Sequence, residues 1–441
     1  MKSWCYGCQH LVFELSDITN SHYRHPLSTS TIMSHYASND KKTSQTDQTQ
    51  TIATIKYQID DGVRHTSEQA WNRGYTNAPN VKQIPVPYPL HDLRALAFLN
   101  GEAGWSWSHS AGVLRKFGFT AIKFDPKWAK VDDEVQAGDY DDLQTLEETY
   151  FPEVKESILK LTGAKRVFIT NSIVRRGDAP VKTPTNGTGS LAAVNCNDQK
   201  NVPDNYKASD ETRSTHLASS DNSRPARGAH VDYTPVGARR SIRRWRPDIY
   251  KAALEAGIID AEDNICAAAK VDAQDKASNA IIDAKYNADG KLGPRYAAYS
   301  VWRPMRTVTR DPLAMAPRWS FPKGGALGFL GYESRMLAAP SMGGDFLREL
   351  ESVVISEEDA KAYESSKGDE AASGLESPQW YYLPEQKPDE VIVLKFFDSA
   401  ALGGGLVSGD VGGAPHASPD LGDTAYGPAR WSIEVRCIAI W

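Results

Sequence analysis

The chain has 441 residues, of which 40% are hydrophobic and 24% are charged, and its formal net charge at pH 7 is −6. These values are typical of a soluble globular protein and argue against a general nucleic-acid binder, whose surface would be basic. No apolar run approaches the ~20 residues of a membrane-spanning helix, and five scattered cysteines favour a reducing compartment. We therefore expect a cytoplasmic monomer or homodimer that binds neither nucleic acid nor membranes.

The first 52 residues have the composition of a disordered tail, because Ser, Thr, Asn and Gln dominate and few apolar groups could offset the entropy of ordering. Residues 53–441 are expected to form one domain. Helices are predicted at 66–73 and 91–100, and a strand at 118–124. The clearest helix is predicted at 141–161, where apolar residues recur at steps of three and four before Gly163.

The second half of the chain is mainly strand-like, with polar or helical insertions predicted near 178–223, 260–290 and 349–377. Strands are expected at 166–174, 296–304, 390–397 and 429–441, a helix at 245–256, and a glycine-rich loop at 403–415. The fold class is therefore mainly β with helical additions. Short strands with helices gathered upstream and in insertions are typical of a decorated β-sandwich or jelly roll.

A possible metal site centres on His230-Val231-Asp232, in a segment that reads as a strand ending in a turn. Side chains at i and i+2 of a strand project from the same face, so the imidazole and the carboxylate can converge on one ion. His416 offers a third ligand. Two histidines and one carboxylate are the ligands of non-haem Fe(II) oxygenases. A zinc hydrolase could use the same three residues, and a non-catalytic jelly-roll binding protein is a further alternative.

A basic anchor follows in the last predicted strand. Alternation places Arg430, Ser432, Glu434 and Arg436 on one face of that strand. Arg430 with Ser432 can grip the carboxylate of a keto diacid, whereas Arg436 is expected to pair with Glu434 or another acid. The 14 residues from His416 to Arg430 allow one turn between adjacent antiparallel strands, which would point both side chains into one cavity.

The chain resembles the fungal asaB-type hydroxylase/desaturases, which are related to gibberellin-desaturase-like and cephalosporin-methoxylase-like proteins of the Fe(II)/2-oxoglutarate oxygenase superfamily. The resemblance extends from about Tyr57 to Trp441. It rests on Thr162-Gly163-Ala164, Arg175-Arg176, Ala229-His230-Val231-Asp232-Tyr233-Thr234-Pro235, Val301-Trp302-Arg303-Pro304, Pro312-Leu313-Ala314, Pro388-Asp389-Glu390, Phe397-Asp398-Ser399, Pro415-His416 and Arg430-Trp431-Ser432-Ile433-Glu434-Val435-Arg436.

The resemblance implies a double-stranded β-helix in which His230, Asp232 and His416 bind Fe(II), and Arg430 with Ser432 holds 2-oxoglutarate. With O₂, such an enzyme oxidises an unactivated C–H bond of a secondary metabolite or its precursor by hydroxylation, desaturation or ring closure. Asn171, where relatives have part of an Asp-His pair, could contact the cosubstrate.

Several basic residues suggest that the substrate is an amino acid or another carboxylic acid. Arg175, Arg176, Arg303 and Arg306 could bind its carboxylate, and Tyr233, which stands where relatives usually have an amide, could contact it as well. Trp302 is interpreted as a core residue rather than a platform for the substrate.

Overall fold

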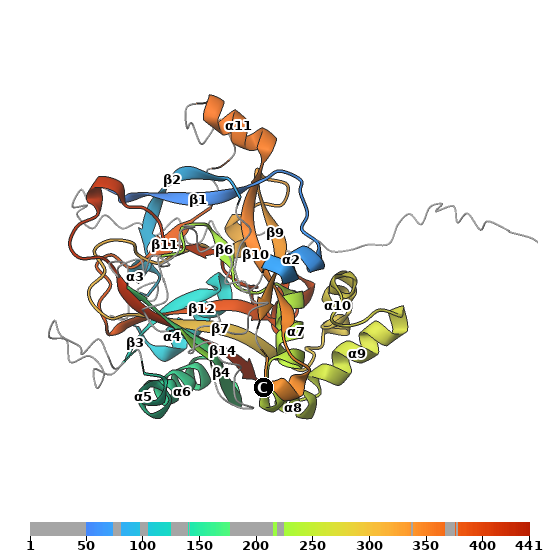
Figure 1. Ribbon diagram of the computed structural model, residues 1–441. Coiled ribbons are helices and arrows are strands. Elements are labelled where there is room, and N and C mark those ends of the chain that lie inside the picture. Colours follow the sequence, from blue (N-terminus) through green and yellow to red (C-terminus); the bar gives the residue numbers. More distant parts are fainter. Residues whose placement is uncertain are drawn as a thin grey trace, which may run out of the picture. The chain divides into compact units, whose positions relative to one another are not determined.

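The computed structural model describes residues 50–73, 81–97, 105–124, 140, 142–176, 215–217, 225–336, 338–366, 375 and 378–441. All of them belong to the unit Gln50–Trp441. The predicted tail and the predicted insertion at 178–223 lie almost entirely outside the described residues. The described part is rich in strands and carries helices, as predicted (Figure 1).

The first of two sheets has eight strands in the order β1-β2-β11-β8-β13-β6-β10-β9, and β1 also pairs with β10. The short strands β6 and β13, which carry the predicted histidine ligands, are neighbours inside this sheet. The bounds are β1 Ile52–Asp60, β2 Gln83–Asp92, β6 His230–Val231, β8 Ala314–Met315, β9 Leu327–Met336, β10 Phe346–Ser356, β11 Trp380–Tyr382 and β13 His416–Ala417.

The second sheet has six strands in the order β3-β12-β7-β14-β4-β5. Its bounds are β3 Phe119–Lys123, β4 Arg166–Arg176, β5 Thr215–Leu217, β7 Tyr296–Pro304, β12 Glu390–Asp398 and β14 Trp431–Ile440. Every residue of β7 and β12 is buried. The sheet is therefore covered on both faces, which explains why these strands read as nearly continuous apolar runs.

One face of the six-stranded sheet is covered by the helical segment after β3 (Figure 1). The helices before and within this segment are α2 Ser67–Arg73, α3 Arg94–Ala97, α4 Trp107–Phe117, α5 Leu143–Thr145, the π-helical turn η1 Leu146–Tyr150 and α6 Phe151–Thr162. Val154 and Ile158 of α6 share an apolar cluster with Val301 and Val435. Pro152 lacks an amide hydrogen for the preceding turn, which accounts for the π-helical step there.

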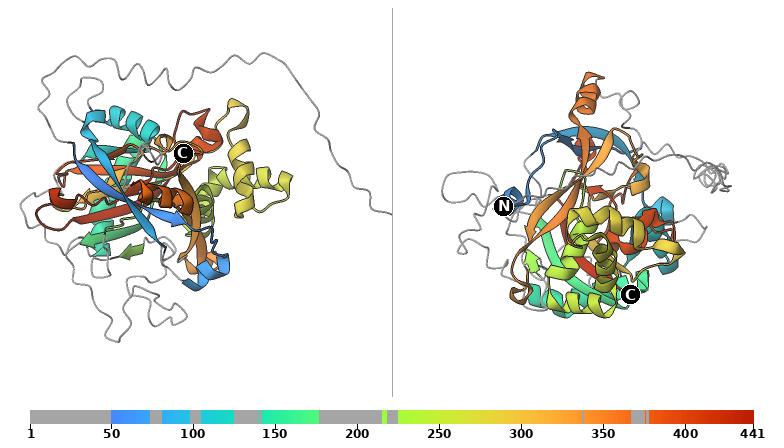
Figure 2. Two further views of the ribbon diagram at one scale, coloured as in Figure 1. Left: turned by 90° about the horizontal axis from the view of Figure 1, so that it is seen from above. Right: turned by 90° about the vertical axis from the view of Figure 1, so that its right-hand side faces the viewer.

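The other face of this sheet meets the eight-stranded sheet across a second apolar cluster, which includes Trp302, Phe396 and Phe346. Figure 2 shows the later helices grouped at one end of the sheets. They are α7 Pro235–Arg244, α8 Pro247–Glu255, α9 Ile258–Ala269 and α10 Asn279–Lys285. The helical character predicted for 260–290 is confirmed.

One predicted helix differs from the structure, and one helix of the structure was not predicted. The segment predicted as helix 91–100 begins with the end of β2, which pairs with β11 at Leu90, His91 and Asp92. Of its described residues, 91–97, only Arg94–Ala97 are helical. The helix predicted at 245–256 is confirmed as α8, whereas α7, which begins directly after the metal-site segment, was not predicted. Thr234 caps it by accepting a hydrogen bond from the Gly237 amide, and Pro235 occupies its first turn. This Thr-Pro pair was a readable signal for a helix start.

The insertion predicted at 349–377 is wrong over its first part. Residues 349–356 belong to β10, which pairs with β6, β9 and β1. Neighbouring cations neutralise its acidic residues: Arg318, for example, forms an ion pair with Glu351 at 2.6 Å. A sequence rich in charge can therefore form a buried strand here. The exposed helix α11, Glu357–Ser365, fits the prediction, and most of the rest lies outside the described residues.

Candidate metal centre and anion pocket

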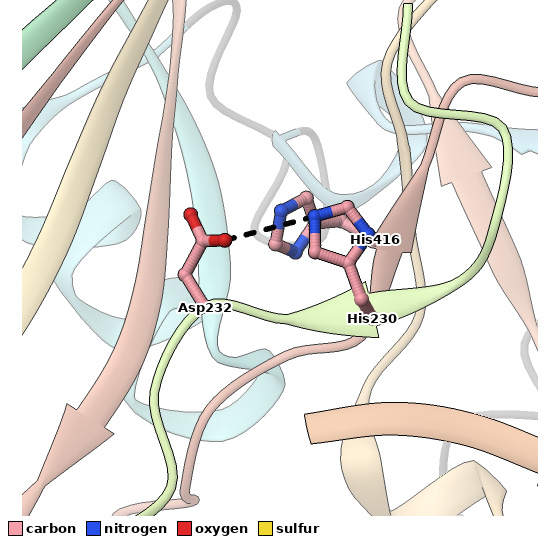
Figure 3. Close-up of side chains that lie close together, drawn as sticks. All are labelled: His230, Asp232 and His416. Carbon is pink, nitrogen blue, oxygen red and sulfur yellow. Dashed lines mark ion pairs between the residues drawn. The ribbon is translucent and has the colours of Figure 1, made fainter. Parts of the chain in front are cut away.

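The three predicted metal ligands meet where β6 and β13 pair. His230 and His416 are direct cross-strand partners, so their side chains leave the same face of the sheet, and their ring centroids are 4.4 Å apart. Asp232 returns to this face two residues later, with Oδ1 3.7 Å from His230 Nε2 (Figure 3). The candidate ligand atoms all lie within 4.8 Å of one another. The convergence expected from the sequence therefore exists in the fold.

Each histidine is oriented by the backbone carbonyl two residues before it. His230 Nδ1 lies 2.8 Å from the Gly228 oxygen, and His416 Nδ1 lies 3.3 Å from the Ala414 oxygen. A proton on Nδ1 donates to that oxygen and leaves the Nε2 lone pair for a metal. Burial, together with His230, lowers the pKa of His416 to about 4, so its ring is neutral at neutral pH. Two imidazoles oriented by backbone carbonyls, together with a carboxylate, suit a divalent transition-metal ion.

Asp232 is the first member of a chain of ion pairs. Its Oδ2 lies 2.7 Å from Nε of Arg436, whose Nη2 lies 3.0 Å from Glu434 Oε1. The same glutamate oxygen accepts a hydrogen bond from Arg175 at 2.8 Å. Burial opposes ionisation of Asp232, but Arg436 and the two histidines hold its pKa well below the usual range. The predicted acidic partner of Arg436 is confirmed, and Asp232 keeps its Oδ1 towards the histidines.

Arg430, directly before β14, is a buried cation of another kind. Its Nη1 donates hydrogen bonds to the Asp311 carbonyl at 2.7 Å and to Ser418 Oγ at 3.1 Å, and its guanidinium lies 5.3 Å from the centre of the Trp302 ring. In the described part of the chain it has no carboxylate in salt-bridge contact, and its Nε has no hydrogen-bond partner. Burial, with Arg175 nearby, lowers the pKa of Arg430 to about 9, so it remains charged at neutral pH. A buried cation of this kind calls for an anion.

One pocket joins the histidines to this cation. Its lining residues are Arg175, Ala226, His230, Trp302, Leu313, His416, Ala417, Ser418, Arg430, Glu434 and Arg436. The two ends come from different sheets, since β13 lies in the eight-stranded sheet and β14 in the six-stranded one. The prediction that His416 and Arg430 lie on adjacent strands is therefore wrong, although both side chains do reach one cavity.

Two residues predicted for the cosubstrate lie beside the pocket rather than in its lining. Ser432 is 1% exposed, and its Oγ has no hydrogen-bond partner among the described residues. Asn171 is buried opposite Arg436 in the β4–β14 pair, and its Oδ1 accepts a hydrogen bond from Thr170 at 3.4 Å. Their roles stay predictions.

The residues predicted to bind substrate are dispersed. Arg175 lines the pocket but is paired with Glu434, whereas the Arg176 guanidinium lies 5.1 Å from the ring centre of Trp431. The Arg306 guanidinium lies against the same indole ring, 4.2 Å from its centre. Tyr233 is buried, with its ring stacked 6.1 Å from that of Phe396.

Arg303 does not reach the pocket. Its guanidinium lies 5.6 Å from each of the Phe124 and Tyr150 ring centres, on the helix-covered face of the sheet, and its Nε donates to the Pro388 carbonyl. Successive residues of β7 point to opposite faces, so Trp302 takes the pocket side instead. The expectation that Arg303 contacts the substrate is corrected accordingly.

Two pocket residues had not been identified from the sequence. Ser418 follows His416 by two residues and supports Arg430; strand alternation after His416 would have indicated it. Trp302 is a core residue, as interpreted, since it is 2% exposed. It is also the surface on which the Arg430 guanidinium rests, and a lone tryptophan in a buried strand gave no signal for this second role.

None of the helices in the described ranges combines the length and apolarity that crossing a bilayer requires.

A family described as "Oxidoreductase/YMDC permease-like domain" matches residues 113–259 and 355–440, which is more than half of the chain. The two matched segments include His230, Asp232, His416 and Arg430.

Similar proteins come from fungi. The chain is 28% identical to "Oxidoreductase chry3" of Gibberella zeae, over 81% of this chain and 90% of that protein. It is 28% identical to "Gibberellin cluster GA4 desaturase" of Gibberella fujikuroi, over 67% and 73% of the two chains. "Alpha-ketoglutarate-dependent dioxygenase phiK" of a fungal species is 22% identical, over 74% and 79%. The solved structure of "iron and alpha-ketoglutarate-dependent endoperoxidase NvfI with different conformation" superposes with a TM-score of 0.46 at 18% identity, covering 88% of this chain and 97% of that one.

Proposed function

Because this chain belongs to the oxidoreductase/YMDC permease-like family, that of the fungal 2-oxoglutarate-dependent oxygenases, we propose that His230, Asp232 and His416 bind its Fe(II). The protein is a dioxygenase with Fe(II), 2-oxoglutarate and O₂ as its cofactor and cosubstrates. It oxidises an unactivated C–H bond of a small molecule of fungal secondary metabolism by hydroxylation, desaturation or oxidative ring closure.

One observation supports this proposal above the others. Three candidate metal ligands lie together, and the two histidines among them line one pocket with a buried arginine that has no acidic partner in the described residues. 2-Oxoglutarate has a 2-oxo acid group that chelates a metal and a second carboxylate at its far end. A zinc hydrolase would have no use for Arg430, and a binding protein that lacks a metal would have no use for the ligand set.

The protein's own residues orient the reactants and exclude water. The carbonyls of Gly228 and Ala414 fix the two imidazoles, and Arg436 holds Asp232 so that its Oδ1 faces them. Arg430 receives the distal carboxylate of 2-oxoglutarate. Fe(II) held by His230, Asp232 and His416 would supply, with 2-oxoglutarate and O₂, the chemistry that oxidises the substrate C–H bond with succinate and CO₂ as co-products.

We further propose that the two sheets form a double-stranded β-helix, with residues 53–441 as a single domain. Support comes from the position of the candidate centre, which lies between two sheets rather than on the surface of one. A cytoplasmic location and a monomeric or homodimeric state are proposed on the sequence arguments given above.

The test is an assay of succinate formation from 2-oxoglutarate by the full chain. We expect turnover that requires both Fe(II) and O₂, and that falls by at least ~100-fold in Asp232→Ala. Hydrolytic activity that persists without O₂ and with Zn(II) would favour the zinc hydrolase. Failure of the metal-loaded protein to turn over 2-oxoglutarate would favour the non-catalytic binding protein.

A further inference from the structure

Arg348 lies in β10 on the face that carries the candidate metal centre. Ser352 of β10 is the cross-strand partner of His230, and residues four apart in a strand share a face, so Arg348 projects to the same side as His230. Phe346, two residues earlier, belongs to the apolar cluster between the sheets. Tyr233, which follows Asp232 directly in the chain, lies beside the Arg348 guanidinium.

The guanidinium of Arg348 is buried, and two of its three nitrogens have no hydrogen-bond partner among the described residues. The side chain is 2% exposed, and its Nε and Nη1 are enclosed without a hydrogen-bond acceptor. Its guanidinium lies over the Tyr233 ring, 4.9 Å from the ring centre. Among the six buried arginines of the described residues, Arg348 alone donates no hydrogen bond to another described residue. The other five are Arg239, Arg246, Arg303, Arg430 and Arg436.

The charges around the candidate centre do not cancel. Arg436 and Arg175 are balanced by Asp232 and Glu434, in the chain of ion pairs described above. Arg430 and Arg348 are left with no acid in salt-bridge contact among the described residues, and the metal ion adds further positive charge. Removing a charged group from water is unfavourable unless an opposite charge compensates it. The distal carboxylate of 2-oxoglutarate would compensate the charge of Arg430, which leaves the charge of Arg348 uncompensated.

We propose that Arg348 binds a carboxylate of the substrate, so that the enzyme acts on organic acids. This inference rests on the proposed function, which assigns Arg430 to 2-oxoglutarate. The substrate carboxylate would lie on the β10 side of Asp232, beside Tyr233, and the cosubstrate carboxylate on the β14 side. Arg348 takes the role that the sequence had suggested for Arg175 and Arg303, because Arg175 is paired with Glu434 and Arg303 packs against Phe124 and Tyr150.

The experiment measures ligand binding to the full chain loaded with Mn(II) and 2-oxoglutarate, by calorimetry. The probes are benzoate, phenylacetate, indole-3-acetate and decanoate, each compared with its methyl ester. We expect at least one acid to bind at least ~10-fold more tightly than its ester to the wild type, because a buried charge-assisted pair discriminates by this much or more. Arg348→Gln should abolish that difference and retain the affinity for 2-oxoglutarate.

Two further variants separate binding from folding. Arg303→Gln removes a buried guanidinium from the opposite face of the other sheet and should leave the preference for acids intact. Arg348→Met should lose acid binding without a lower Tm of the ligand-free protein, since a charge without a partner contributes no folding stability there. An arginine with a purely structural role predicts the opposite result, a lower Tm with unchanged binding.

The outcomes are distinct. If Arg348→Gln binds the acids as the wild type does, or if no acid exceeds its ester in the wild type, the assignment of Arg348 is overturned while 2-oxoglutarate binding stands. If the wild type with Mn(II) binds no 2-oxoglutarate, the proposed function itself fails.

Discussion

Two kinds of arginine face the candidate metal centre. Arg175 and Arg436 share Glu434, and Arg436 also holds Asp232, so their charges are balanced within the described structure. Arg430 rests on an indole ring and, among the described residues, donates only to a carbonyl and a hydroxyl. This difference separates arginines that shape the site from an arginine that is ready to bind an anionic ligand.

Arg430→Gln tests this distinction with two cosubstrates. We expect the affinity for 2-oxoglutarate to fall by about 2 kcal/mol or more, roughly 30-fold, because a buried charge pair with the distal carboxylate is lost. The affinity for 2-oxobutanoate, which has no second carboxylate, should change little. Calorimetric titration of the Mn(II)-loaded protein measures both, and Arg430→Lys, which keeps the charge but not the fork of donors, should be intermediate. Equal losses for the two oxo acids would contradict the assignment.

Glu434 gives the site a pH dependence. Burial opposes its ionisation, but Arg175 and Arg436 lower the pKa of Glu434 to about 2 from its ordinary 4.5. Its charge therefore stabilises the folded state fully above pH 4.5, by up to about 3 kcal/mol, and this contribution disappears as the pH falls towards 2. Urea unfolding of wild type and Glu434→Gln should show a stability difference that narrows below pH 4.5. A difference that stays constant into acid would show that the Glu434 charge is not the cause.

For single residues, the sequence predicted which side chains form the site better than it predicted which residues they contact. The i, i+2 spacing of His230 and Asp232 needs only the local geometry of a strand, and alternation along β14 placed Glu434 and Arg436 on one face with Arg430, as the pocket lining shows. The partners of each arginine depend on strands far away in sequence. Arg303 was therefore assigned to the wrong face, and Arg348 was not identified at all.

At the scale of elements, the site depends on how closely short strands approach. Gly413, three residues before His416, runs against β12 and β6: a Cβ there would lie 2.1 Å from the Phe396 carbonyl oxygen and 2.8 Å from Val231 Cγ1. Glycine is needed because of this close approach. The same contact sets where β13, and with it His416, meets β6.

Gly413→Ala should therefore affect folding and metal binding together. We expect overpacking to reduce the free energy of unfolding by about 1–3 kcal/mol and, by shifting β13, to weaken Mn(II) binding at least ~10-fold. The matched control is Gly112→Ala in α4, where a Cβ meets nothing within 4 Å; it should be neutral or up to about 1 kcal/mol more stable. Denaturant unfolding and Mn(II) titration measure the two effects. Unchanged metal affinity in Gly413→Ala would show that this contact does not position His416.

Elements with a strong internal pattern were predictable, and those defined by their partners were not. The predicted strand at 296–304 has the bounds of β7, because its composition is strand-like along its whole length. The acidic residues of β10 led to the prediction of an exposed insertion. The cations that neutralise them, such as Arg318, come from other segments and cannot be identified from the local sequence. The two-residue strands β6 and β13 were recognisable only through the ligands that they carry.

For the whole molecule, the eight-stranded sheet presents His230, Asp232 and His416, and the six-stranded sheet presents Arg430 and Arg436. The general composition and the mixture of strands and helices were evident from the sequence. That the final strand faces β13 from the other sheet, rather than pairing beside it, depends on the arrangement of both sheets, which no local pattern records.

The central claim is that this interface between sheets binds a metal ion and 2-oxoglutarate together. The most direct measurement is a crystal structure of the full chain with Mn(II) and 2-oxoglutarate, using anomalous scattering to locate the metal. We expect the metal between His230 Nε2, Asp232 Oδ1 and His416 Nε2, chelated by the oxo acid, with the distal carboxylate on Arg430. A metal bound elsewhere, or 2-oxoglutarate bound away from Arg430, would contradict the account.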